Sequence, residues 1–366
     1  MRTNPFQLFM EDPTRSVPTT VAKIEKNYNA PLQSLREIFA NDTDEVNLKG
    51  RIDYQLLMDE SKLGLPRMQT RSASSAETMR VRKKSGIYLE VPHYKKNGAI
   101  RADDFLGKVE DNASERMVID TIESEIAQRF TNSWDDFTLL DEYNYANAIQ
   151  GLVRDGLDDT KIDIYDKLGL TQKVFEWSFG ADYNPTPDAR KAIAYQKKAL
   201  AGTVTNRRIG ICSGDFWDAL VTNKFLIDTY KYTDSKFLRS LNLEGMSFLD
   251  IEWLQYDNDT VDTSGTITKW IPEGTAFIVP VGIPDLFINV NAPADTMPEV
   301  LGKAKHRYSN YWMSDDRRNL ELEAQTNTMT FCTRIESIIK LTIKNHTPSE
   351  PTGTFTPPVV AEHRRR

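Results

Sequence analysis

The sequence has little of what most catalytic, secreted and membrane-bound proteins need. It contains two cysteines, Cys212 and Cys332, and four histidines in 366 residues. Two cysteines are too few for a disulfide framework and are typical of a reducing compartment. No apolar run approaches the roughly 20 residues of a membrane-spanning helix, and residues 1–16 lack the hydrophobic core of a signal peptide. We therefore expect a soluble protein that is made in a cytosol and does not bind a membrane.

The chain also lacks the common catalytic and cofactor motifs. It has no Gly-rich phosphate loop, no HExxH, no GxSxG and no Cys/His spacing of a zinc site. Cys212 lies between a predicted strand and a predicted helix, where a nucleophile could sit, but Asp218 stands where a phosphatase loop would need an arginine. A small buried thiol is the better interpretation. We expect no catalytic residue, no cofactor and no bound metal.

One acidic stretch, residues 257–265, resembles a calcium loop. Asp257, Asp259 and Asp262 could supply ligands, but Val261 stands at the fifth position and Thr268 at the twelfth, where carboxylates are needed. We interpret the stretch as the turn of a hairpin whose strands lie within 246–258 and 266–271.

Positive charge is concentrated in one segment. Residues 67–96 hold eight basic and two acidic side chains, whereas the whole chain carries a net charge of −7. Met79 and Val81 alternate with arginines, residues 83–86 have turn composition, and apolar residues alternate with polar ones over 87–91. This pattern predicts a β-hairpin. A two-stranded ribbon is marginally stable alone in water, so it needs a partner surface.

Nucleic acid is an alternative partner for this segment. Its charge suits phosphate, and Tyr88 and Tyr94 could stack on bases. The chain as a whole is acidic, however, and no known nucleic-acid-binding motif appears. Contact with another copy of the same chain is the sharper hypothesis, because the basic segment is complementary to the acidic remainder.

The rest of the chain alternates helices and strands. Residues 1–30 predict an irregular, extended arm, and 31–40 a short helix. An apolar stripe with a cap at Asn112 predicts one continuous helix of about 45 residues. A break near 131–136, where helix formers are poor, is the alternative. Further expected elements are strands at 161–170, 173–180 and 207–214, helices at 184–202 (capped by Thr186 and stopped by Gly202) and 215–232, two strands within 320–343, and a disordered tail at 347–366.

Residues 276–295 form an apolar, β-rich stretch that is interrupted by proline. Pro280, Pro284 and Pro293 lack the N–H group that a central strand donates. Proline confines a strand to an edge or a bend, so we expect the chain to change direction here.

The order of these features resembles the major capsid protein E family of tailed bacteriophages, the lambda-type coat proteins. The matching segments are YLEVPHYKKNGAIRADDF (88–105), NYNAPLQSLREIF (27–39), ICSGDFWDALVTN (211–223), and 271–312 followed by 315–341, where Gln325 and Asn327 fit the family's Gln-x-Asn strand. Met329 and Ile335–Glu336 stand where the family often has proline, and PEVL (298–301) replaces a common VNT. The resemblance covers about residues 27–345.

This resemblance implies an α+β fold of the Hong Kong 97-like capsid type. The expected parts are an N-terminal arm (1–50), an extended β-hairpin loop (51–105), a peripheral domain with a long spine helix (106–184 and 300–346), an axial domain (185–299) and a disordered tail (347–366). The bend at 276–295 is then the return from the axial domain to the peripheral sheet.

The function implied is that of a major capsid protein, which assembles with itself into the pentamers and hexamers of an icosahedral shell around double-stranded DNA. We expect no enzymatic activity, assembly in the host cytoplasm and residence in the virion. Scaffold, decoration and portal proteins are further partners of this class, and packaged DNA would lie near the subunit without specific contacts. A minor virion or vertex protein of the same fold is the alternative.

The candidate contact residues between subunits belong to two groups. The first comprises basic and apolar residues of the hairpin: Arg80, Arg82, Lys83, Lys84, Ile87, Leu89 and Val91. The second is Arg317 and Arg318, which precede the closing strands. A contact of the peripheral domain and a surface pair without a partner are the two interpretations of this pair.

Overall fold

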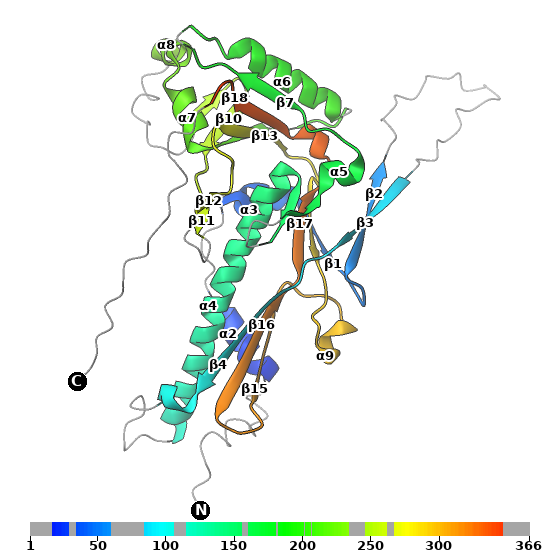
Figure 1. Cartoon of the computed structure of the whole chain (residues 1–366), viewed down its shortest axis with the longest axis vertical. Coiled ribbons are helices and arrows are strands. Elements are labelled where there is room, and N and C mark those ends of the chain that lie inside the picture. Colours follow the sequence, from blue (N-terminus) through cyan, green and yellow to red (C-terminus); the bar gives the residue numbers. More distant parts are fainter. Residues whose placement is uncertain are drawn as a thin grey trace, which may run out of the picture.

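The computed structural model is elongated, with a helix-covered sheet at one end and a helix-backed sheet at the other (Figure 1). It describes residues 17–28, 34–59, 84–105, 115–155, 160–180, 182–200, 202–205, 207–233, 246–261 and 267–346. The cap at Asn112 and the tail 347–366, both predicted from the sequence, lie outside these ranges. The helices discussed below are α2 (Val17–Asn27), α3 (Ser34–Phe39), α4 (Glu115–Gln150), α5 (Ile164–Leu168), α6 (Thr186–Ala199), α7 (Gly214–Val221), α8 (Lys224–Thr233) and α9 (Met297–Val300).

The long helix α4 runs from one end of the molecule to its middle (Figure 1). It has 36 residues and continues through 131–136, so of the two alternatives the continuous helix is the one that forms. Its length is about 54 Å at 1.5 Å per residue. The stripe Ile126, Phe130 and Trp134 is almost completely buried. Packing of that stripe outweighs the weak helix propensity of the sequence around it.

A three-stranded antiparallel sheet lies along the first half of α4. Its order is β15 (Tyr308–Met313), β16 (Asn319–Thr326) and β4 (Tyr94–Arg101). Ile122, Ile126 and Phe130 of the helix form one core cluster with Tyr311 and Leu322 of the sheet. The indole nitrogen of Trp134 donates to Ser309 Oγ at 3.0 Å, which fixes the helix against β15.

Within the predicted irregular arm 1–30, residues 17–27 instead form the helix α2, whereas residues 1–16 lie outside the described ranges. Val17, Val21 and Ile24 pack against the same core cluster as α4. Tyr28 follows the helix, and its ring meets that of Trp134 edge-on at 5.3 Å. The apolar side chains of α2 pack on a surface formed by α4 and the sheet beside it, which lie far away in the sequence. The short helix expected at 31–40 is confirmed as α3.

A second three-stranded sheet occupies the middle of the molecule. Its order is β1 (Thr43–Asn47), β14 (Phe287–Asn291) and β17 (Thr328–Cys332), with β1 parallel and β17 antiparallel to β14. All five residues of β14 and of β17 are buried. Phe39 of α3 packs on Phe287 of β14 with ring centroids 4.9 Å apart. This layer joins the two ends of the molecule.

The six-stranded sheet forms the other end, flanked by α6, α7 and α8 (Figure 1). Its order is β7 (Val174–Trp177), β18 (Ile339–Ile343), β13 (Thr275–Val281), β8 (Arg207–Cys212), β10 (Ile251–Gln255) and β9 (Met246–Phe248). Trp177, Phe216 and Trp253 pack together beneath it, with Phe216 stacked on Trp253 at 6.2 Å between centroids. β7 and β18 belong to the ranges assigned to the peripheral domain, whereas β13, β8, β10 and β9 belong to the predicted axial range, so one sheet draws on both. The division into domains stays a prediction.

The proline-interrupted stretch passes from one sheet to the other. β13 lies in the six-stranded sheet and β14 in the middle sheet, and the turn between them contains Gly282 and Asp285 with positive φ of 86° and 56°. Pro280 is paired with β8, but the register of β18 on the other side stops at Ile278. Proline is tolerated there because the strand is locally an edge.

The extended loop contains a ribbon, but its strands differ from the predicted ones. β2 (Asp53–Asp59) pairs antiparallel with β3 (Lys84–Glu90). Residues 84–86 therefore belong to a strand rather than to a turn, and the partner of β3 is β2 rather than the run around Met79 and Val81. Those two residues lie outside the described ranges.

Several smaller elements differ from the expectation. Residues 161–170 were predicted to be a strand, but β6 (Thr160–Asp163), which pairs with β5 (Leu152–Arg154), ends where Asp163 caps α5. Thr186 is the first residue of α6 rather than its cap, because Pro185 occupies the cap position, and Asn184 Oδ1 accepts from the Thr186 nitrogen at 2.9 Å. The helix expected at 215–232 is divided into α7 and α8, and Asn223 between them accepts from Leu226 N.

Strand pairing explains the remaining differences. The expected hairpin at 246–271 is two hairpins, β9 with β10 and β11 (Asp259–Val261) with β12 (Ile267–Lys269). The two strands expected within 320–343 are three: β16, β17 and β18. No helix in the described ranges is both long enough and apolar enough to cross a membrane.

Candidate functional site

The β2–β3 ribbon projects from the side of the molecule (Figure 1). It is a separate two-stranded sheet, and within the described residues no third strand joins it. Each strand therefore has an outer edge of backbone N–H and C=O groups outside the ladder, which is a surface on which another chain can pair. This is the geometry that a contact between copies requires.

One face of the ribbon is anchored in the subunit's own core. Leu89 and Val91 are 1% and 6% exposed and belong to the central hydrophobic cluster, against which Ile87 also packs. Tyr54 of β2 lies over Phe331 of β17 with ring centroids 5.7 Å apart. The Val91 nitrogen donates to Ile52 O at 2.9 Å, which closes the base of the ribbon.

This burial bears on the predicted contact set. Leu89 and Val91 were assigned to a neighbour, and their own chain already covers them, so their role in a contact stays a prediction. Tyr88, on the opposite face, is 63% exposed. Alternation in the sequence places Tyr88 and Leu89 on opposite faces of the strand. The alternation does not show which of the two faces the subunit itself covers. Arg80, Arg82 and Lys83 lie outside the described residues, and of Lys84 only its backbone in β3, opposite Asp59, is described.

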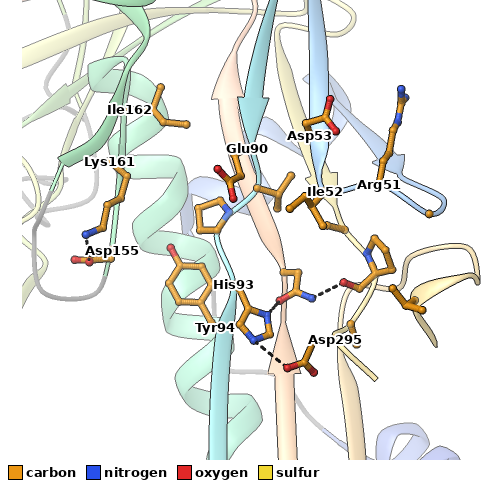
Figure 2. A pocket seen from close by; sticks show the side chains of 18 residues that line it. Arg51, Ile52, Asp53, Glu90, His93, Tyr94, Asp155, Lys161, Ile162 and Asp295 are labelled. Atoms are coloured by element: carbon orange, nitrogen blue, oxygen red, sulfur yellow. Dashed lines mark hydrogen bonds and ion pairs between the residues drawn. The ribbon is translucent and has the colours of Figure 1, made fainter. Parts of the chain in front are cut away.

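A groove of about 1090 Å³ lies at the root of the ribbon, between it, β6 and the segment after β14. Figure 2 shows His93 and Asp295 facing each other across its floor, with Tyr94 beside them and Lys161 paired with Asp155 on one side. Apolar residues from the ribbon base and from β6 line part of its wall.

His93, Asp295 and Asn327 line the groove and are bonded to one another or to residues beside it. His93 Nδ1 lies 2.7 Å from Asn327 Oδ1, and His93 Nε2 lies 3.7 Å from Asp295 Oδ2. Lys95 Nζ lies 3.5 Å from Asp295 and 2.6 Å from Glu323. Burial by itself would raise the pKa of Asp295, but the hydrogen bond from Gln325 and the charge of Lys95 together hold that pKa below its usual value.

Lys95 and Tyr94, beside this floor, have raised pKa values. The hydrogen bond from the Lys95 ammonium to Glu323, together with the nearby carboxylates, raises the pKa of Lys95, so its amine stays protonated. Burial raises the pKa of Tyr94, so its phenol stays neutral. The groove therefore combines charged, mutually paired groups with an apolar wall.

A second exposed surface is the turn between β15 and β16, at the end of the molecule opposite the six-stranded sheet (Figure 1). Asp316 organises it: Oδ1 accepts from Ser314 Oγ at 2.6 Å and from the Arg318 nitrogen at 3.0 Å. Arg317 adopts φ of +58°, and the Arg318 side chain is 83% exposed. Both predicted arginines therefore stand on a projecting turn, whose role in a contact stays a prediction.

The residues weighed as catalytic or calcium-binding have structural surroundings. Cys212 is fully buried beneath α7, and burial raises the pKa of its thiol well above the usual value, which confirms the buried-thiol interpretation. Asp257 pairs with Lys269 at 2.8 Å beside the β11–β12 hairpin. Asp259 is in β11, and Asp262 lies outside the described residues.

Comparison with known proteins identifies a family of phage capsid proteins. A family model described as phage major capsid protein E matches residues 59–343. The chain is 27% identical over 184 residues to the major capsid protein of Pseudomonas phage KPP10. That alignment spans 46% of this chain and about half, 52%, of the relative.

Solved structures share the fold at low sequence identity. The asymmetric unit of the bacteriophage PhiM1 mature capsid superposes with a TM-score of 0.50 at 10% identity and covers 87% of this chain and 89% of that one. The putative capsid protein of a prophage of E. coli CFT073 gives a TM-score of 0.46 at 14% identity, over 72% of this chain and 80% of that one. The fold is the α+β Hong Kong 97-like capsid fold, and the chain belongs to the phage major capsid protein E family.

Proposed function

We propose that this protein is the major head subunit of a tailed bacteriophage and that its activity is assembly with copies of itself. The subunits would form pentamers and hexamers of an icosahedral shell around double-stranded DNA, built in the host cytoplasm. Ring closure of this kind uses heterologous contacts, in which two different surfaces of the same chain meet. Neither catalysis nor a cofactor is needed for this activity.

One observation supports the proposal most strongly. The β2–β3 ribbon is anchored through Leu89 and Val91 but presents Tyr88 and its strand edges outward. A ribbon of two strands gains little stability from its own pairing, so covering its outer face with a neighbouring copy is favourable. Exposed ion pairs contribute about 0–1 kcal/mol each, so buried apolar area repeated around the shell would supply most of the stabilisation.

Charge reversal tests the role of the basic part of the loop. Arg80, Arg82, Lys83 and Lys84 are changed together to Glu, and a matched variant exchanges Arg and Lys at the same positions, which keeps the charge. We expect the Glu variant to remain folded by circular dichroism but to give no shells in negative-stain microscopy, whereas the exchange variant assembles normally. Normal shells from the Glu variant would contradict the assignment of this surface.

The copy number of the chain in the particle distinguishes a major head subunit from a minor virion or vertex protein. A major subunit dominates a stained gel of purified virions, whereas a vertex or other minor protein gives a faint band. Expressing the chain alone and then together with its neighbouring reading frames tests whether further partners are needed. Scaffold, decoration and portal proteins are the partners that those reading frames would supply.

A further inference from the structure

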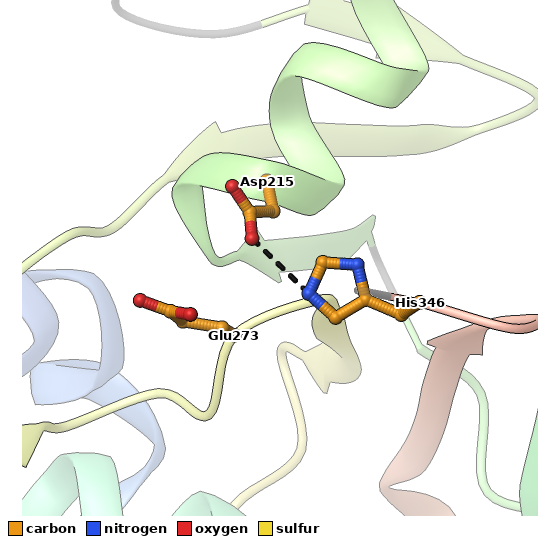
Figure 3. A group of neighbouring side chains, drawn as sticks. All are labelled: Asp215, Glu273 and His346. Carbon is orange, nitrogen blue, oxygen red and sulfur yellow. Dashed lines mark ion pairs between the residues drawn. The ribbon is translucent and has the colours of Figure 1, made fainter. Parts of the chain in front are cut away.

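Three potential metal ligands from distant parts of the chain meet beside the six-stranded sheet. Asp215 lies in the first turn of α7, Glu273 in the turn before β13, and His346 just after β18. One ligand atom from each lies within 4.8 Å of the other two. Figure 3 shows the three side chains approaching from separate segments, with the imidazole of His346 directed toward Asp215. Within the described residues this is the one group of three or more such side chains that meets this distance.

The imidazole of His346 faces a carboxylate of the cluster. Its Nε2 atom lies 3.1 Å from Asp215 Oδ2, yet it is shielded from solvent and makes no hydrogen bond of acceptable geometry to any described residue. Two ligand atoms that each lie about 2.0–2.2 Å from a tetrahedral zinc ion are themselves about 3.3–3.6 Å apart. The separation of Nε2 and Oδ2 is slightly shorter, so a small outward movement of either side chain would bring both atoms to ligand distance.

The backbone holds the three ligands together without the ion. The Ile343 nitrogen donates to Gly274 O at 3.0 Å, which ties the end of β18 to the Glu273 turn. Thr275 and Ser213 exchange hydrogen bonds, since Ser213 N donates to Thr275 O at 3.0 Å and Thr275 N donates to Ser213 Oγ at 3.2 Å. These contacts connect the segments carrying all three ligands, and a site built on connected backbone loses little entropy when the ion enters.

A glycine fixes the orientation of the histidine ring. Gly274 has φ of +65°, and a Cβ added to it would lie 2.3 Å from Cδ2 of His346. The imidazole therefore packs directly on the backbone of the residue that follows Glu273. Any other residue at 274 would be strained and would also displace the ring.

The charges at the site favour a divalent cation. Two carboxylates and a neutral imidazole carry two negative charges, which one divalent ion balances. Lys269 forms its ion pair with Asp257 at 2.8 Å, and its charge also acts on Glu273 from there. One nitrogen and two oxygen ligands, with a position left for water, form a set that zinc accepts and that calcium, which prefers six to eight oxygens, does not.

We propose that Asp215, Glu273 and His346 form a zinc site that ties the start of α7 and the turn before β13 to the point where the C-terminal segment leaves β18. The site is independent of the proposed assembly, because all its ligands belong to one subunit. An ion there would fix the direction in which the chain departs after His346.

Calorimetric titration of the full-length, unassembled chain with zinc tests the site, with calcium and manganese titrated in parallel. We expect one saturable zinc site per chain, a higher melting temperature with zinc than with EDTA, and weaker binding of calcium. His346→Ala and Asp215→Asn each remove a ligand and should lower the affinity for zinc by at least about 10–100-fold. That is the loss typical of removing a residue that only supports a ligand. Glu273→Gln provides a third variant if either of these fails to fold.

His93→Ala is the matched control. His93 also faces an aspartate, with Nε2 3.7 Å from Asp295 Oδ2, but Lys95 already supplies a cation there at 3.5 Å. This variant should bind zinc as the unchanged protein does. Absence of a saturable zinc site, preference for calcium, or equal affinity in the ligand variants and the control would each overturn the proposal.

Discussion

Glu142 Oε1 on the long helix accepts a hydrogen bond from the backbone nitrogen of Leu35, 107 positions earlier, at 2.8 Å. The same carboxylate oxygen accepts from Ser34 Oγ at 2.9 Å and from Tyr256 OH at 3.2 Å. Glu142 is 4% exposed. A single buried side chain thus joins the N-terminal segment, the long helix and the strand region after β10.

Removal of this carboxylate should destabilise the subunit. Glu142→Ala leaves the N–H and O–H donors around it without an acceptor, and hydrogen bonds to a charged group are worth about 1.5–3 kcal/mol. We expect the free energy of unfolding in urea to fall by at least about 2 kcal/mol. Asp120→Ala, an exposed acidic position on the same helix, should change it by less than about 0.5 kcal/mol. Equal effects of the two changes would argue against the bridging role.

The close approach of β8 to β10 predicts a second effect. A Cβ on Gly210 would lie 2.3 Å from Cε3 of Trp253, which is fully buried. Gly210→Ala should therefore cost about 1–3 kcal/mol through overpacking. Gly98→Ala in β4 has no atom within 4 Å of the added Cβ and should be tolerated. Thermal unfolding of both variants measures the difference, and a stable Gly210→Ala protein would show that the indole can move aside.

The two faces of the ribbon should respond differently to truncation. Leu89→Ala removes a buried side chain and should lower the free energy of unfolding of the unassembled subunit by about 2–5 kcal/mol. Tyr88→Ala removes an exposed one and should leave that stability within about 0.5 kcal/mol, while reducing shell yield in sedimentation. Normal shell yield from Tyr88→Ala would remove this residue from the proposed contact.

The buried thiols should be unreactive in the folded protein. Burial raises the pKa of Cys332 to about 12, and the pKa of Cys212 is also well above its usual value. Because the thiolate is the reactive form, a thiol reagent at pH 8 should label neither cysteine in the native subunit and both in urea. Rapid labelling without urea would show that β8 or β17 opens.

The same shift predicts a loss of stability in alkali. The neutral thiol of Cys332 is favoured in the folded state, so its contribution is fully present below the unfolded pKa of about 9 and is lost as the pH rises toward 12. Urea titrations at pH 8 and pH 10.5 should show a smaller pH-dependent loss for Cys332→Ala than for the unchanged protein. An identical loss would assign the effect to other groups, such as the buried tyrosines.

Local patterns in the sequence predicted those elements whose stabilising contacts are near in the chain. The apolar stripe from Ile122 to Phe137 indicated the long helix, and the prolines at 280 and 284 indicated a change of direction. The helix continues through 131–136, and residues 17–27 form a helix rather than an irregular arm, for one reason. The buried surface that stabilises Trp134 and Val21 comes from β15 and β16, nearly 200 and 300 positions away.

The sequence by itself determined the family, the alternation that places Tyr88 opposite Leu89, and the absence of recognisable catalytic motifs, because these depend on residue type and short spacing. Only the tertiary structure decided which strand pairs with β3, which face of the ribbon the subunit covers, and that Asp215, Glu273 and His346 meet. Strand pairing and side-chain clusters join positions whose separation in the chain leaves no local periodicity, so they are fixed only when the whole chain packs.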